Sequence, residues 1–475
     1  MGAAKAPSAS LDAHLLTASE ALSLIREGDM TIEDYAQSLL RRIDERDSQV
    51  KAWAWLDRNQ LLEQARALDA VPLDKRSAVH GMPVAIKDVI YTKDMPTQFN
   101  SLAYKDDFPK LDAASIKFLR SAGALLMGKT TSTEFAATAD GPPTRNPNDL
   151  SRTPGGSSSG SGAAVGDFQA PVALGTQTGG SVVRPASYNG TYGFKPTWGA
   201  ISREGQKFFS VTYDTLGFFT RGIDDLQLLA DVFGLQDDDD APAAMQSVAG
   251  QRVAIFRTMM WPEAAEGTRA ATDRAAEILH RHGATVEDVE MPADFDKLPE
   301  WYNVVLAVEG GTAFVPEQRA NAEHLAPLLI GYANNAEGYT RRAYLEALDG
   351  MAVLRPKMDA LLSAYDIALT PSVPDEAPVG MSTGSYIFCK IWTALHVPVL
   401  NMPGFQGPNG MPIGLSLLAP RYKDRQLLNT AVPVGELFEA EGGWTRKTHS
   451  KGLQNGHTNG HTNGHENGNE DETGF

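Results

Sequence analysis

The sequence predicts an α/β protein, a single large domain with a central mixed, mainly parallel β-sheet covered by helices on both faces. Three observations predict it. Apolar, strand-like segments alternate with helix-like patterns along the chain, as in sheets with crossover helices. The 475 residues are enough for one large core. The composition, 42% hydrophobic and 21% charged, is that of an ordinary globular protein.

Two helices and a strand are expected at the start of the chain. The first helix begins at a capping box formed by Thr17 and Glu20 and ends at Gly28. The second begins after Thr31. Its apolar face consists of Ile32, Tyr35, Leu39, Leu40 and Ile43. Residues 81–88 (GMPVAIKD) then predict a buried strand that ends in charge.

The middle of the chain contains an unusual stretch. A capped amphipathic helix at residues 112–123 and a strand at 124–127 precede it. Residues 141–197 are rich in Gly, Ser, Thr and Pro and are too long for an ordinary loop. Long stretches of this kind in compact proteins tend to be functional.

Alternation of strand and helix patterns resumes after this stretch. A strand is expected at residues 252–256, a helix at 265–282 and a further apolar segment at 365–369. The acidic run 237–240 is interpreted as a solvated loop, with a metal site as the weaker alternative.

The composition divides the chain into a domain at 1–446 and a tail at 447–475. The tail repeats Asn, Gly and His, cannot bury a core and is predicted to be disordered. His457, His461 and His465 recur every four residues and suit either a flexible solubilising tail, which we favour, or loose binding of a transition metal.

Charge and hydropathy exclude several partners. The formal net charge of −17 repels phosphate backbones, which argues against nucleic acid. No apolar run approaches the 18 to 20 residues of a membrane span, and no secretory signal opens the chain. The lone Cys389 allows no intrachain disulfide and is interpreted as a small buried apolar residue. We therefore expect a cytoplasmic protein without a membrane partner.

Two glycine-rich clusters of hydroxyl residues, at 155–160 and 179–181, indicate acyl-transfer chemistry. Glycines around a serine let several backbone N–H groups point toward one place, as stabilisation of an oxyanion requires. A serine hydroxyl needs a base within reach, and no histidine lies in or near the stretch. Lys87 is the best candidate, because burial at the end of its strand would lower its pKa.

These segments resemble the amidase signature family in order and spacing. The similarity includes GMPVAIKD, GPPTRNPNDLSRTPGGSSSGS, GTQTGGSVVRPASYNGTYGFKPT and DTLGFFTR, a signature core at about residues 80–231. It returns near the C-terminus in YDIALTPSVPDEAP and WTALHVPVLNMPGFQGPNGMPIGL. The resemblance implies the amidase signature fold.

By this resemblance Lys87 is the base, Ser157 is the bridging serine after a cis peptide bond, and Ser181 is the nucleophile. An oxyanion hole is implied at the backbone N–H groups of Thr178, Gly179, Gly180 and Ser181. The implied reaction is hydrolysis of the C–N bond of a small carboxamide through an acyl-enzyme, without metal or organic cofactor. The implied partner is a small-molecule amide, and a homodimer is consistent with the family.

One departure from the commonest family pattern concerns the substrate. Gln177 stands where many members have Asp, and Val183 precedes Arg184 in a GTQTGGSVxRP sequence that resembles a malonamidase-like branch. In that branch the equivalent arginine contacts a substrate carboxylate. Arg184 is therefore expected either to bind an acidic group of the substrate or to pair with an internal acid, the second being slightly favoured.

Neighbouring residues have two interpretations each. Asp88 either orients Lys87 or caps a nearby helix, and Arg145 is expected to fix its loop rather than touch substrate. Aromatic candidates for the substrate pocket, each more typical of a core, are Phe208, Phe209, Trp301, Tyr302, Tyr386 and Trp392.

Two further motifs are rejected on context. Residues 123–130 match the P-loop pattern, but the segment between its glycines is itself strand-like. Ser158 is the centre of a G-x-S-x-G match, but no buried strand precedes it and His280, His282, His324 and His396 have no triad context. The alternatives that remain are an amidotransferase A-type subunit that needs partner proteins and a non-catalytic amidase-like binding protein.

Overall fold

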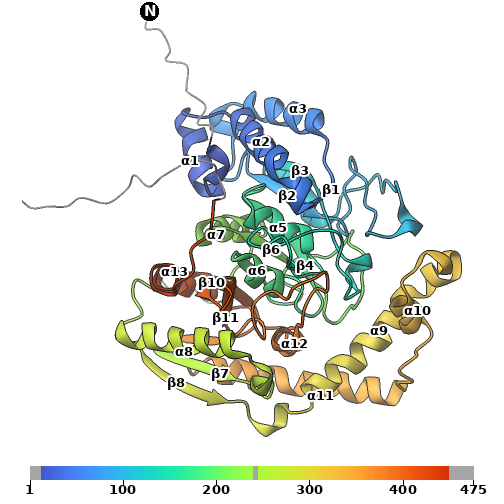
Figure 1. Ribbon diagram of the computed structural model, residues 1–475, viewed down its shortest axis with the longest axis vertical. Helices are drawn as coiled ribbons and strands as arrows, with labels where there is room; N and C mark the ends of the chain where they lie inside the picture. Colours follow the sequence, from blue (N-terminus) through green and yellow to red (C-terminus); the bar gives the residue numbers. More distant parts are fainter. Residues whose placement is uncertain (1–11, 239–243, 449–475) are drawn as a thin grey trace, which may run out of the picture.

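The computed structural model describes residues 12–238 and 244–448, and one eleven-stranded sheet runs through this part of the chain (Figure 1). The strands are β1 (Trp53–Trp55), β2 (Pro83–Lys87), β3 (Leu125–Thr130), β4 (Val172–Gln177), β5 (Tyr192–Lys195), β6 (Thr215–Thr220), β7 (Arg252–Arg257), β8 (Thr285–Glu290), β9 (Ile367–Pro371), β10 (Val399–Gln406) and β11 (Pro412–Leu418). Their order is β1-β3-β2-β4-β6-β5-β10-β11-β9-β7-β8. The predicted α/β class and mixed sheet are confirmed.

The sheet is not mainly parallel, which corrects the sequence-based expectation. In the described chain, β3, β2 and β4 form parallel pairs, as do β9, β7 and β8, whereas the other six pairs are antiparallel. A parallel pair needs a crossover of a dozen or more residues. Only residues 407–411 separate β10 from β11, so these two strands must run antiparallel.

The sheet consists of two halves that are also halves of the sequence. The six strands from β1 to β5 in the sheet order all come from residues 53–220, and the five from β10 to β8 come from residues 252–418. The halves meet where β5 pairs with β10, with Lys195 opposite Val399. The glycine-rich clusters lie in the first half.

Helices cover both faces of the sheet. They are α1 (Ala18–Glu27), α2 (Ile32–Val50), α3 (Arg58–Asp69), α4 (Ala114–Ser121), α5 (Ser159–Gly166), α6 (Val183–Asn189), α7 (Ile223–Val232), α8 (Glu266–Arg281), α9 (Leu298–Asn321), α10 (Pro327–Ala333), α11 (Arg341–Leu362), α12 (Ile387–Ala394) and α13 (Asp424–Glu441). Ala85 and Phe219 join the apolar layer beneath α2, α3 and α5. Their neighbours Ile86 and Phe218 face the opposite layer, as the alternation of side chains along a strand requires. Both faces of these central strands are therefore buried.

The first two helices begin where the sequence predicts. Thr17 and Glu20 form both hydrogen bonds of a capping box at α1, and Thr31 caps α2. The helix expected at 112–123 is shorter and lacks a side-chain cap. Asp112 instead accepts hydrogen bonds from the Lys93 backbone N–H, at 2.9 Å, and from Arg120.

The stretch at 141–197 folds into regular structure and forms the centre of the molecule. It contains α5, β4, α6 and β5, and every residue from 153 to 197 is buried. Its small residues allow this close packing. A Cβ on Gly160, for example, would lie 2.1 Å from the carbonyl oxygen of Ala52.

Several sequence-based predictions fall near or beyond the limits of the described residues. The tail histidines and most of the 447–475 segment lie outside them, as do Asp239 and Asp240. Within them, Asp237 accepts hydrogen bonds from the backbone N–H groups of Arg425 and Gln426. Residues 12–238 and 244–448 contain no group of three or more His, Cys, Asp or Glu that could hold a metal ion. No helix in the same ranges is long and apolar enough to cross a membrane.

Candidate active site

Lys87 lies at the end of β2 and is fully buried. Its Nζ donates to Ser157 Oγ at 2.8 Å and to Thr176 Oγ1 at 2.8 Å, and it lies 3.4 Å from the Thr176 carbonyl oxygen. It forms no ion pair with a carboxylate in the described part of the chain. Burial therefore holds the pKa of Lys87 well below its ordinary value, although Asp214 raises it and Arg184 lowers it further.

Ser157 precedes α5 in the first glycine-rich cluster. The Gly156–Ser157 peptide bond is cis, as the resemblance implies. The Ser157 carbonyl oxygen accepts from the Thr133 backbone N–H at 3.2 Å, which ties this loop to the segment after β3. Ser157, whose Oγ is the partner of Lys87, is also one of the residues that line a cavity.

The second cluster is the turn from β4 to α6, which contains Ser181. Gln177 Oε1 accepts from the backbone N–H groups of Val182 and Val183, at 2.9 and 3.0 Å, and so holds the start of α6. From the other side, Tyr302 Oη donates to the Thr178 carbonyl oxygen at 3.1 Å. The turn is fixed at both ends.

Glycines 179 and 180 allow two tyrosines to lie against this turn. A Cβ on Gly179 would lie 2.7 Å from Tyr302 Oη, and a Cβ on Gly180 would lie 2.7 Å from the Tyr386 Cβ. The backbone N–H groups of Gly179, Gly180 and Ser181 donate no hydrogen bond to another described residue. They border the same cavity as Ser157. Free N–H groups beside a hydroxyl are what an oxyanion would need.

The cavity has a volume of about 130 Å³ and joins the two clusters. Ser157, Ser181 and Arg184 of α6 are among its lining residues. Its other walls come from the segment at 136–139, from α9 and α10, and from the loop before α12. Those walls include Tyr302, Leu306, Leu328, Tyr332 and Tyr386, and the connection between β5 and β6 adds Phe209. The space suits a small substrate with an apolar or aromatic part.

Arg184 is buried in α6 and does not pair with an acid among the described residues, against the slightly favoured expectation. Its Nε and Nη2 donate to the Gly156 carbonyl oxygen, at 3.1 and 2.5 Å, and Nη1 donates to that of Gly384. The guanidinium lies 5.5 Å from the centre of the Tyr386 ring. A positive charge therefore borders the cavity without a neutralising carboxylate.

Asp214 is a buried acid that the sequence reasoning did not single out. Its carboxylate accepts from Thr178 Oγ1 at 2.5 Å and from the backbone N–H groups of Phe209 and Ser210. Burial raises the pKa of Asp214 to about 6, and those hydrogen bonds oppose the shift. Its place in DTLGFFTR is the signal that could have identified it.

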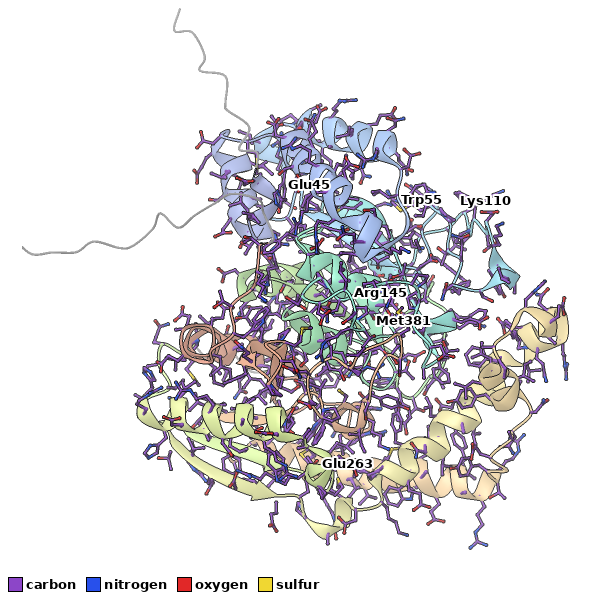
Figure 2. The ribbon with its side chains drawn as sticks, viewed as in Figure 1. Glu45, Trp55, Lys110, Arg145, Glu263 and Met381 are labelled. Atoms are coloured by element: carbon purple, nitrogen blue, oxygen red, sulfur yellow. The ribbon has the colours of Figure 1, made fainter. Side chains whose placement is uncertain are left out.

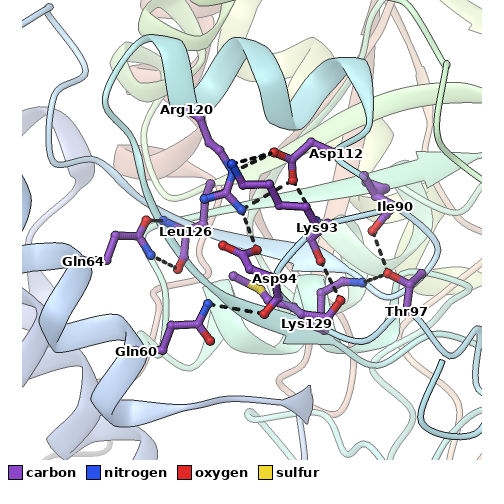
Figure 3. A network of polar contacts seen from close by, with 12 residues as sticks. Gln60, Gln64, Ile90, Lys93, Asp94, Thr97, Asp112, Arg120, Leu126 and Lys129 are labelled. Atoms are coloured by element: carbon purple, nitrogen blue, oxygen red, sulfur yellow. Dashed lines mark hydrogen bonds and ion pairs between the residues drawn. The ribbon is translucent and has the colours of Figure 1, made fainter. Parts of the chain in front are cut away.

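Asp88 neither orients Lys87 nor caps a helix. It lies 3.0 Å from Lys129 Nζ on the neighbouring strand and accepts from the Gln98 backbone N–H. Lys129 also donates to Thr97 Oγ1 at 2.6 Å (Figure 3). Since Lys129 lies inside β3, residues 123–130 do not form a phosphate-binding loop, which confirms the rejection of that motif.

Other residues considered from the sequence lie away from the cavity. Arg145 is half-buried on the loop between β3 and α5 (labelled in Figure 2), it does not line the cavity, and its backbone N–H donates to the Val50 carbonyl oxygen. Ser158 is buried and donates to the Thr176 carbonyl oxygen at 3.3 Å. Among the aromatic candidates Phe209, Tyr302 and Tyr386 line the cavity, whereas Phe208, Trp301 and Trp392 do not. Cys389 is buried, as expected.

Comparison with known proteins places the chain in a family. The family model described as Amidase matches residues 34–428, so the chain belongs to the amidase family. The A subunit of the glutamyl-tRNA(Gln) amidotransferase from Streptomyces avermitilis is 30% identical over 482 residues, covering 90% of this chain and 96% of that protein.

Solved structures agree with this fold. A crystal structure described as an amidase is 28% identical, with a TM-score of 0.79 over 90% of this chain and 100% of that one. The native peptide amidase of Stenotrophomonas maltophilia is 27% identical, with a TM-score of 0.76 over 90% of this chain and 97% of its own. The predicted amidase signature fold is confirmed.

Proposed function

We propose that this chain hydrolyses the C–N bond of a small carboxamide through an acyl-enzyme on Ser181. The observation that carries the proposal is the buried contact of 2.8 Å between Lys87 Nζ and Ser157 Oγ. A lysine with a pKa held well below its ordinary value is neutral in a larger fraction of molecules and can accept a proton. Ser157 lies on the same cavity wall as Ser181 and suits a relay between them.

The reaction follows from these positions. Neutral Lys87 accepts a proton from Ser157 while Ser157 accepts the proton of Ser181, whose Oγ bonds to the amide carbon. The negative charge on the carbonyl oxygen is stabilised by the backbone N–H groups at 178–181. The relay returns the proton to the leaving nitrogen as the C–N bond breaks. Water then gives a proton to the same relay and attacks the ester. As the ester bond to Ser181 Oγ breaks, the relay returns that proton to Ser181 Oγ, and the acid is released.

The test is turnover on a panel made of malonamate, a neutral aliphatic amide, an aryl amide and an indolyl acetamide. Ser181→Ala removes the nucleophile and is expected to abolish activity on whichever amide is cleaved. A fluorophosphonate probe is expected to label wild-type Ser181. Wild-type protein that neither turns over an amide nor reacts with the probe would favour the non-catalytic alternative.

A role as the A-type component of an amidotransferase is the second candidate, because curated relatives about 30% identical carry that name. Such a role requires partner proteins, and the formal charge of −17 does not favour contact with RNA. Cleavage of a simple amide by the purified chain alone would contradict this candidate.

For the substrate we propose a malonamidase-like preference in which Arg184 binds an acidic group. Its buried guanidinium borders the cavity and meets carbonyl oxygens rather than a carboxylate. Arg184→Ala is expected to lower kcat/KM for malonamate by about 10- to 100-fold more than for a neutral amide, since one charge-assisted hydrogen bond is lost.

Because Arg184 also holds Gly156, its removal can disturb Ser157 and lower all activities together. The ratio of the two activities is therefore the measurement. Arg184→Lys keeps the charge and serves as the control, with a ratio closer to wild type. An unchanged ratio in Arg184→Ala would contradict the preference.

A further inference from the structure

A second cavity, of about 750 Å³, lies between α11, the segment after β5 and the connection from β11 to α13. It shares no lining residue with the cavity that contains Ser181. Three arginines line it, one from each of these segments: Arg355, Arg203 and Arg421. Asp349 is the single carboxylate on its described wall. This is an unusual concentration of positive charge for a chain of net charge −17.

Of these three arginines, Arg355 has the fewest partners among the described residues. Its Nε donates to the Ala394 carbonyl oxygen at 3.2 Å, and its buried Nη2 has no hydrogen-bond partner among residues 12–238 and 244–448. It also forms no ion pair with an acid in those ranges. Burial and the nearby Arg421 lower the pKa of Arg355 to about 10. The side chain therefore carries a charge that the protein leaves uncompensated.

The other two arginines of the cavity wall, Arg203 and Arg421, have more hydrogen-bond partners than Arg355. Arg203 donates from Nη1 to the carbonyl oxygens of Val211 and Asp214, at 2.9 and 2.8 Å, and forms no ion pair within the described chain. Arg421 is neutralised by Asp359 through Nε and Nη2, at 2.9 and 2.6 Å. Its side chain nevertheless forms part of the cavity wall.

The rest of the wall is aromatic and neutral. The Trp198 ring stacks on His396 at 4.3 Å, and the Arg203 guanidinium lies 4.9 Å from the Trp198 ring centre. Burial and the nearby Arg355 together lower the pKa of His396 to about 2, so the imidazole is neutral at physiological pH. The cavity thus keeps a net positive charge.

We propose that this cavity binds the phosphate group of a small molecule, either a phosphate monoester or inorganic phosphate itself. Guanidinium groups bind phosphate oxygens with paired N–H donors, and a bound anion would offset the repulsion between Arg355 and Arg421. The volume is within the range of ordinary small-molecule sites and leaves room for an organic part beside the phosphate. The proposal does not depend on the chemistry at Ser181.

The experiment is isothermal titration calorimetry of the full chain with inorganic phosphate, glycerol 3-phosphate and glycerol, at an ionic strength held constant with chloride. Saturable one-to-one binding is expected for the two phosphates and none for glycerol. Tighter binding of glycerol 3-phosphate would indicate an organic ligand, and tighter binding of phosphate an inorganic one. Absence of saturable binding for both phosphates would overturn the proposal.

Two pairs of variants locate the binding. Arg355→Met is expected to weaken phosphate binding at least tenfold, whereas Arg342→Met, an exposed arginine on the same helix, leaves it unchanged. If Arg355→Met fails to fold, Ala352→Glu places a negative charge on the cavity wall from an exposed position. Its control is Val353→Glu, 59% exposed and off that wall. Equal binding by a variant and its control would overturn the proposal.

Discussion

Two lysines on neighbouring strands, Lys87 on β2 and Lys129 on β3, are both fully buried but have opposite surroundings. Lys87 meets two hydroxyl groups and no carboxylate, whereas Lys129 forms an ion pair of 3.0 Å with Asp88. Burial lowers the pKa of both, and for Lys129 attraction to Asp88 opposes that shift. Burial alone therefore does not make a base. A base also requires the absence of a paired acid and contact with a cavity.

The largest expected effect separates the two lysines by activity. Lys87→Met removes the proposed proton acceptor and is expected to lower kcat/KM by about 10²- to 10⁴-fold, the usual contribution of general base catalysis. The folded structure is expected to persist, because no charged partner is left behind. The measurement is turnover on the best amide of the panel together with a thermal melt. Near wild-type turnover by a folded Lys87→Met protein would remove Lys87 from the mechanism.

The next effect separates them by stability. Lys129→Met leaves the Asp88 carboxylate buried without its partner, and is expected to lower the free energy of unfolding by about 3–5 kcal/mol. Urea denaturation measures the loss, and kcat per folded molecule is expected to change little. The control is Lys129→Met combined with Asp88→Asn, which removes both charges and should regain much of the stability. If the double variant is as unstable as the single one, the ion pair is not the cause.

The smallest effect concerns the pH at which Lys87 loses its proton and could act as the proposed base. kcat/KM is expected to rise with pH along a limb that follows deprotonation of Lys87, below the ordinary lysine range. Ionised Asp214 raises the pKa of Lys87, so Asp214→Asn is expected to move this limb to lower pH. The comparison is informative above pH 6, where Asp214 is ionised. An unmoved limb, or a move to higher pH, would contradict the electrostatic link.

Much of the fold could be predicted because it depends on local patterns. The capping box at Thr17 and the apolar strand that ends at Lys87 have signals in adjacent residues. The balance of parallel and antiparallel strand pairs could not be predicted from the sequence, because it depends on which distant strands become neighbours in the sheet. β5 and β10, for example, are about two hundred residues apart in sequence.

In the candidate site, too, residues with a local sequence signal could be predicted, and contacts between distant segments could not. The glycine-rich clusters and the family resemblance indicated Lys87, Ser157 and Ser181, and the structure brings these segments to one place. Thr176 lies in the GTQTGG segment but was not singled out, because its contact with Lys87 exists only when β2 and β4 pair. The carbonyl partners of Arg184 were also unforeseen, since Gly384 lies two hundred positions away. The second cavity assembles arginines from three distant segments and has no local pattern.

The division of the sheet into two sequence halves has a consequence for synthesis on the ribosome. When residue 220 has been made, Lys87, Ser157 and Ser181 and all six strands of the first half are present. Tyr302 and Tyr386, which lie over the glycine turn, have not yet been translated. A nascent chain can thus pair its first strands early, while Ser181, the proposed nucleophile, stays uncovered and open to water. The proposed active site is therefore completed late in translation, when the second half of the chain has been made.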